Sequence, residues 1–193
     1  MKTYIFHYIA IFLFLGTAAY SQNIYADDSN RVITKTLGTD TIHSNLSLTE
    51  NLSKISTFSR QLQVFEIANF DKLIENEQMV TVFVVKNNAF DFMDKKELEA
   101  FLSNSNKNNL AVMQSYYIIP GRVDEHAIRR AVTDGGGAAS FRTINNKTIR
   151  FLAEGESIYL YTDAGSKSKL LETNFYHNKG FFHVTSNIPI KKS

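Results

Sequence analysis

The hydrophobic pattern of this 193-residue chain changes character near residue 138, and that change restricts the folds open to it. Between residues 49 and 132, apolar side chains recur mostly at intervals of three to four residues, the spacing of helices with one buried face. After residue 138, short strand-like runs follow one another, separated by turn residues such as Asn145-Asn146. Helices followed by a meander of strands predict the α+β class.

One strand is expected inside the helical half. Residues 79–85 are β-branched and aromatic with almost no polar alternation, a pattern typical of a strand buried on both faces. A second strand at 117–119 is expected to end at Pro120, which lacks a backbone donor. The remaining strands are predicted at 140–142, 148–152, 157–161, 169–175 and 181–185.

Residues 1–21 have the layout of a cleavable secretory signal. Lys2 precedes an apolar run over 5–15, and small residues at Ala19 and Ser21 predict cleavage before Gln22. The apolar run is shorter than the roughly 20 residues that a membrane-spanning helix needs. We therefore expect no transmembrane anchor after cleavage, and an exported protein that is secreted, periplasmic or associated with the cell surface.

The chain contains no cysteine, so no disulfide can support the fold and the lipoprotein route is closed. Export without disulfides favours a bacterial source. The formal net charge is +2, and loss of Lys2 with the signal leaves +1, with basic residues scattered along the chain. This charge argues against nucleic acid as a partner.

Residues 22–48 are polar and lack a sustained period, which predicts a flexible leader. The folded domain is then expected to occupy residues 49–191. Ser47 or Thr49 can cap its first helix.

Three segments of the domain resemble the signatures of the fasciclin-like adhesion domain. They are 81–90 (TVFVVKNNAF), 116–123 (YYIIPGRV) and 179–184 (KGFFHV), the last leading to Ile188-Pro189. Val85 and Lys86 stand where the family has proline and threonine, and Tyr117 stands where it has histidine. The resemblance implies N-terminal helices packed on a bent, mostly antiparallel β-sandwich or sheet, and an adhesion function.

Most residues of these signatures suit structural roles. Phe83 and Phe90 are expected to be buried at a strand-to-helix junction, and Asn87 can cap the helix that follows. Gly121 and Gly180 suit backbone positions with positive φ. We interpret His183 as a hydrogen-bonded histidine that fixes two segments. The signature residues are Thr81, Phe83, Asn87, Phe90, Tyr116, Tyr117, Pro120, Gly121, Gly180, His183 and Pro189.

Motifs for chemistry are missing from the sequence. The histidines are scattered, no G-x-S-x-G occurs, and Gly135-Gly136-Gly137 lacks the context of a phosphate loop, so we predict no catalytic residue, cofactor or metal site. The predicted function is non-catalytic adhesion or recognition of a protein or glycan of a matrix, biofilm or host.

Three further possibilities stay open. Tyr159, Tyr161 and Tyr176 form either an exposed aromatic patch for sugar or protein, or a core face with hydroxyls at the surface. A small-ligand carrier, of lipid or a haem-like group, would use an apolar pocket among Tyr116, Tyr117 and His183. A hydrolase or lyase would need acids and a histidine in one cleft.

Overall fold

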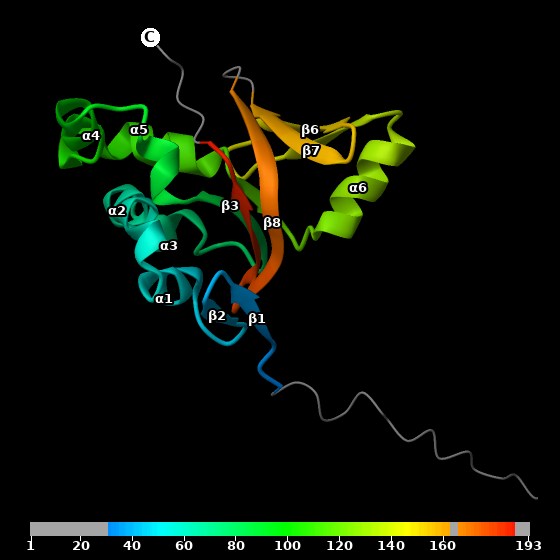
Figure 1. The fold of residues 1–193 in the computed structure, drawn as a ribbon, viewed down its shortest axis with the longest axis horizontal. Coiled ribbons are helices and arrows are strands. Elements are labelled where there is room, and N and C mark those ends of the chain that lie inside the picture. Colours follow the sequence, from blue (N-terminus) through cyan, green and yellow to red (C-terminus); the bar gives the residue numbers. More distant parts are fainter. Residues whose placement is uncertain (1–30, 163–165, 188–193) are drawn as a thin grey trace, which may run out of the picture. The chain divides into compact units, whose positions relative to one another are not determined.

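A computed structural model describes residues 31–162 and 166–187, and the fold is shown in Figure 1. Within this part, residues from Val32 onward belong to one compact unit. The predicted signal at 1–21, the first part of the predicted leader and Pro189 lie outside the described residues.

Helices fill the first half of the domain, as the periodicity predicts. Ser47, one of the two cap residues that the sequence offers, caps α1 and forms a capping box with Glu50. The helices are α1 Leu48–Ser53, α2 Ser59–Ala68, α3 Phe70–Leu73, α4 Lys95–Phe101, α5 Lys107–Ser115 and α6 Glu125–Asp134, with 3-10 turns η2 Ser56–Phe58, η3 Asn87–Phe90 and η4 Asn104–Asn106.

Seven strands form one sheet with the order β4-β3-β9-β8-β7-β6-β5, and these elements confirm the α+β class. All neighbours in this sheet are antiparallel except β3 and β9, the second and third strands of this order, which pair in parallel. The strands are β3 Val80–Val85, β4 Ile118–Pro120, β5 Ala138–Arg142, β6 Thr148–Glu154, β7 Ser157–Thr162, β8 Lys167–His177 and β9 Gly180–Thr185.

The long strand β8 bends the sheet and joins its two halves (Figure 1). Its first residues pair with β7, and the rest pair with β9 across two register shifts on either side of Glu172. Asn174 lies within the second shift and has a φ of 59°. Such irregularities increase local bending, and here they let the β5–β7 half fold back over β3 and β4.

Each face of the β3–β9 pair packs against its own hydrophobic core. Val82 and Phe182 face the helices α1–α3, whereas Phe83 faces α6 and the β6–β7 strands. Every residue of β3 is buried, which confirms the expectation of a strand covered on both faces. A third apolar cluster, containing Phe90 and Leu110, joins α2, α5 and η3.

The flexible leader predicted over 22–48 is wrong for the part that the structure describes. Strands β1 Thr34–Leu37 and β2 Asp40–His43 form an antiparallel hairpin. Leu37 and Ile42 are buried in the same core as Phe182. Most other hairpin residues are polar and are exposed or only partly buried. The hairpin therefore lacks the apolar alternation that predicts strands from sequence.

Asn87 caps a different helix from the one expected. Its side-chain oxygen accepts a hydrogen bond from the backbone N–H of Arg60 in the first turn of α2, at 3.0 Å. Its amide nitrogen donates to the Ser56 carbonyl and the Ser59 hydroxyl, both at 3.0 Å. Asn87 thereby fixes the turn after β3 to the start of α2, whose N-cap residue Phe58 supplies no side-chain bond.

Replacing Asn87 with alanine is expected to lower the free energy of unfolding by about 1 to 2 kcal/mol, because several bonds at the start of α2 are lost together. Asn88, its exposed neighbour, provides the matched control, and Asn88→Ala should change stability by less than about 0.5 kcal/mol. Urea unfolding of both variants measures the difference. Equal stabilities would contradict this role for Asn87.

Candidate functional site

The three signature segments meet on the adjacent strands β4, β3 and β9. Phe83 lies opposite His183 in the parallel pair, and Thr81 lies opposite Ile119 in the antiparallel pair. The backbone N–H of Phe83 also donates to the Tyr117 carbonyl at 2.8 Å. Segments separated by many residues in sequence therefore brace one another on three adjacent strands at the β4 end of the sheet.

Thr81 ties β3 to the loop after β4. Its hydroxyl donates to the Gly121 carbonyl at 2.9 Å and accepts from the Val123 backbone N–H at 2.8 Å. Gly121, with a φ of 89°, reverses the chain at this point. A buried hydroxyl that bonds on both sides fixes the start of the segment leading into α6.

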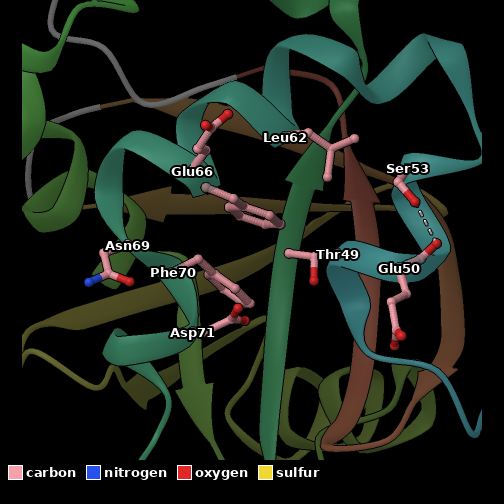
Figure 2. Close-up of a pocket in the computed structure, with 9 residues that line it drawn as sticks. Thr49, Glu50, Ser53, Leu62, Glu66, Asn69, Phe70 and Asp71 are labelled. Atoms are coloured by element: carbon pink, nitrogen blue, oxygen red, sulfur yellow. Dashed lines mark hydrogen bonds between the residues drawn. The ribbon is translucent and has the colours of Figure 1, made fainter.

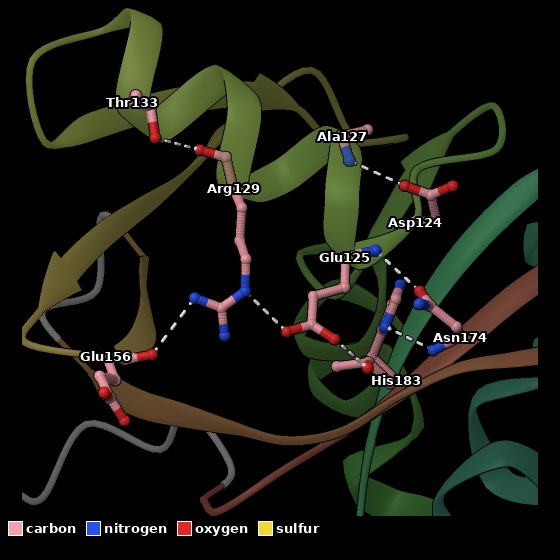
Figure 3. A network of polar contacts seen from close by, with 9 residues as sticks. Asp124, Glu125, Ala127, Arg129, Thr133, Glu156, Asn174 and His183 are labelled. Carbon is pink, nitrogen blue, oxygen red and sulfur yellow. Dashed lines mark hydrogen bonds and ion pairs between the residues drawn. The ribbon is translucent and has the colours of Figure 1, made fainter.

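His183 lies in the interior, where both ring nitrogens form hydrogen bonds; Figure 3 shows the one to Asn174. Its Nε2 donates to the Val123 carbonyl at 2.9 Å, and its Nδ1 accepts from the Asn174 backbone N–H at 3.2 Å. Its ring stacks on Phe83 with centroids 5.4 Å apart. Burial lowers the pKa of His183 to about 4, so the ring is neutral at physiological pH.

Glu125 extends this network to the start of α6 (Figure 3). Its backbone N–H donates to the Asn174 side chain at 2.7 Å, and its carboxylate accepts from Thr173 and Arg129. The Thr173 hydrogen bond lowers the pKa of Glu125 most. With both nitrogens of His183 occupied, the arrangement offers no free imidazole nitrogen to act as a base beside Glu125.

The other signature residues lie around this centre. Tyr117 is buried in the core with Phe83, and burial raises the pKa of its hydroxyl. Tyr116 packs against the same cluster, whereas Pro120 is exposed. Gly180 has a φ of 134° and lies directly against the Val80 backbone. Phe83 and Phe90 are both buried, but in separate clusters.

Two surface grooves adjoin α3. The larger, about 610 Å³, is lined by residues of α1 and α2 and by Phe70 and Asp71 of α3 (Figure 2). Its apolar lining residues are Leu62, Phe65 and Phe70. Its rim carries the carboxylates of Glu50, Glu66 and Asp71 (Figure 2). The smaller, about 380 Å³, is lined by residues that include Ile74 and His177. Neither groove includes Tyr116, Tyr117 or His183, the residues of the proposed carrier pocket.

Across residues 31–162 and 166–187, no group of three or more histidine or acidic side chains is arranged to hold a metal ion. None of the helices in the same residues combines the length and the apolar character needed to cross a bilayer.

Tyr159 and Tyr161 lie on the outer face of the β5–β8 half, away from the core. Along β7, buried residues alternate with these half-buried tyrosines, which puts both rings on one face. The strand register places Arg150 and Lys167 on either side of Tyr161, and Leu152 and Lys169 on either side of Tyr159. The tyrosines therefore lie among basic neighbours on an accessible surface.

Lys167 links the two tyrosines to a carboxylate. Its ammonium lies 4.1 Å from the centre of the Tyr159 ring and 5.8 Å from that of Tyr161. It forms an ion pair with Glu154 at 2.6 Å, and the Tyr161 hydroxyl donates to the same carboxylate at 2.8 Å. These hydrogen bonds lower the pKa of Glu154 and raise that of Lys167. The contacts hold both rings in a defined orientation.

Tyr176 does not join this surface, contrary to the expectation of a three-tyrosine patch. It lies seven residues beyond Lys169 on β8, roughly 23 Å along an extended strand. Its ring contacts Phe181, with centroids 4.7 Å apart, and the Arg122 guanidinium lies 5.1 Å from its centre. Tyr176 therefore belongs to a separate cation–aromatic cluster near the start of β9.

Sequence reasoning missed the basic residues around the tyrosines. Arg142, Arg150, Lys167 and Lys169 are scattered in sequence, but they lie on β5, β6 and β8 around β7 and face the same way as Tyr159. The detectable signal was their alternation with residues that face inward, such as Phe141, Ile149 and Leu170. We define the outer face as Arg142, Arg150, Leu152, Glu154, Tyr159, Tyr161, Lys167 and Lys169.

Comparisons with known proteins point to one family. The model of the fasciclin domain matches residues 53–188. Among solved structures, a FAS1 domain pair from the insect cell adhesion molecule fasciclin I matches with a TM-score of 0.64 and 11% identity, over 82% of this chain and 66% of that one. At this identity the likeness shows the fold alone. Comparison with curated protein sequences finds no match.

Proposed function

This chain belongs to the fasciclin domain family, whose members are in general adhesion or recognition modules, and we propose that it is a non-catalytic adhesion module acting outside the cytoplasm. Residues 1–21 direct its export and are removed, leaving a protein without a transmembrane anchor. Its partner is a protein or glycan of a matrix, biofilm or host surface, and the outer face makes the contact.

The half-buried Tyr159–Tyr161 pair on the outer face is the observation that supports this surface most strongly. Aromatic side chains supply large contact areas at interfaces, and tyrosine adds a polar group without much conformational entropy. Both rings lie on a sheet, and Lys167 and Glu154 hold them in place before a partner arrives. A surface organised in advance loses less entropy on binding.

The buried hydrogen-bond network of the signature segments supports the same proposal. Thr81, His183 and Glu125 all form hydrogen bonds that join strands or fix the start of α6. These residues hold the scaffold and are buried or partly buried. The surface residues of β5–β8 are therefore available for contact, and several weak sites on neighbouring molecules would add up through avidity.

Tyr159→Ala and Tyr161→Ala, combined in one variant, are expected to lower binding by at least about tenfold, since truncation of an interface aromatic commonly costs more than 1 kcal/mol. The measurement is an array of glycans and matrix proteins probed with the mature protein. Tyr176→Ala is the matched control because its ring lies elsewhere on β8. Equal signals from the double variant and the unmodified protein would exclude this surface.

A further inference from the structure

We propose that the outer face binds an acidic polysaccharide, a polymer whose sugars carry carboxylate or sulfate groups. This inference rests on the proposed adhesion function and names the class of partner for the same surface. It is carried by the pairing of each tyrosine with basic side chains across neighbouring strands.

The charges on the outer face are predominantly positive. Four basic residues, Arg142, Arg150, Lys167 and Lys169, come from β5, β6 and β8. Among the described residues that the register places on this face, Glu154 is the one carboxylate, and it already bonds Lys167 and Tyr161. A ligand therefore meets a surface with an excess of positive charge.

The arrangement matches an extended polymer better than a compact ligand. Arg150 and Lys167 lie on the strands either side of Tyr161, so their backbone positions are about 10 Å apart. Along β7, Tyr159 and Tyr161 are separated by about 7 Å. Cations therefore alternate with aromatic rings across neighbouring strands, an arrangement that an extended polymer can follow.

Both side-chain types suit acidic sugars. The apolar face of a sugar ring packs on an aromatic ring, while tyrosine hydroxyls form hydrogen bonds to its polar edge. Arginine and lysine form charge-assisted hydrogen bonds with carboxylate or sulfate groups, and the planar guanidinium of Arg150 can bond two oxygens at once. A neutral glycan would use the tyrosines and leave Arg142, Arg150 and Lys169 without a role.

Nucleic acid is the other polyanion to consider, and the charge density disfavours it. Nucleic acids carry a phosphate at every nucleotide, and their binders present dense basic surfaces. Here four cations share the face with Glu154, and the formal net charge of the whole chain is only +2. A polymer with more widely spaced charges fits this surface better.

The test measures binding of the mature protein to heparin and to alginate, a sulfated and a carboxylated polysaccharide, with neutral dextran and a single-stranded oligonucleotide alongside. The variant Arg150→Gln/Lys169→Gln is expected to weaken polysaccharide binding by at least about tenfold. The control Lys95→Gln/Lys96→Gln makes the same charge change on exposed residues of α4 and should shift affinity less than about twofold.

Each outcome decides the proposal. Salt-sensitive binding of heparin or alginate, lost in the first variant and kept in the control, supports it. Equal losses in both variants, equal affinity for dextran, or tighter binding of the oligonucleotide would overturn it. If no polyanion binds but tyrosine-dependent binding of a neutral glycan or protein persists, this inference fails while the proposed adhesion function stands. Circular dichroism verifies that both variants remain folded.

Discussion

Gly180→Ala is expected to lower the free energy of unfolding by about 3 kcal/mol or more. A Cβ at this position would lie 2.2 Å from the Val80 carbonyl oxygen, a backbone atom that cannot rotate away. The φ of 134° also belongs to a region open mainly to glycine. Since Val80 and Gly180 form the first pair of the β3–β9 ladder, relief of the clash would separate β3 from β9.

Gly121→Ala separates the two causes. Gly121 has a φ of 89°, but an added Cβ there meets no atom within 4 Å. We expect it to cost only about 1 to 2 kcal/mol, the backbone strain without the clash. Guanidinium unfolding of both variants gives the comparison. If Gly180→Ala proved no less stable than Gly121→Ala, the close approach of β9 to β3 would be in error.

The second large effect is a loss of stability as pH falls from 6.5 toward 4. Burial lowers the pKa of both His177 and His183 to about 4, against about 6.5 in an unfolded chain. Between these values the unfolded state binds more protons than the native state, so stability rises with pH. Each histidine then contributes a slope of up to about 1.4 kcal/mol per pH unit.

The charged neighbours of these histidines do not reverse the sign of this pH dependence. Glu125 and Asp124 raise the pKa of His183, Lys35 lowers it, and Lys179 lowers that of His177, but burial is the largest cause for both. The carboxylates of Glu50, Glu125 and Glu154 also have lowered pKa values, so their contribution is lost only at more acidic pH.

Urea unfolding at several pH values between 7.5 and 4.5 measures the slope. His177→Gln keeps a polar side chain beside the Phe181 carbonyl. It removes one titrating group, so the slope of the free energy of unfolding against pH should fall by up to about 1.4 kcal/mol per pH unit. A free energy of unfolding that stayed constant from pH 7 to 5 in the unmodified protein would show that these rings are not held neutral.

The helices and β3 could be predicted because their sequence patterns are local. Residues 80–85 are buried on both faces, and such a strand consists of consecutive β-branched and aromatic residues. The β1–β2 hairpin was missed because few of its side chains, such as Leu37 and Ile42, reach the core. Most of its residues therefore carry the polar pattern of a leader.

The surface could be predicted only in part, since it depends on register between strands. The two-residue spacing of Tyr159 and Tyr161 predicted that they share a face, but nothing local told whether Tyr176 lies beside them. The bends within β8 and its length place Tyr176 far along the strand. Likewise, Asn87 caps α2 rather than its own turn because the chain folds back, a contact that spans 27 residues.

The most direct test of the outer face as the contact surface is backbone hydrogen exchange of the mature protein, with and without the partner that the array or polysaccharide assays identify. We predict added protection in β6, β7 and the start of β8, around Arg150, Tyr161 and Lys169, with no change along α1–α3. Protection confined to the groove of Glu66 and Phe70, with β6 and β7 unaffected, would contradict it.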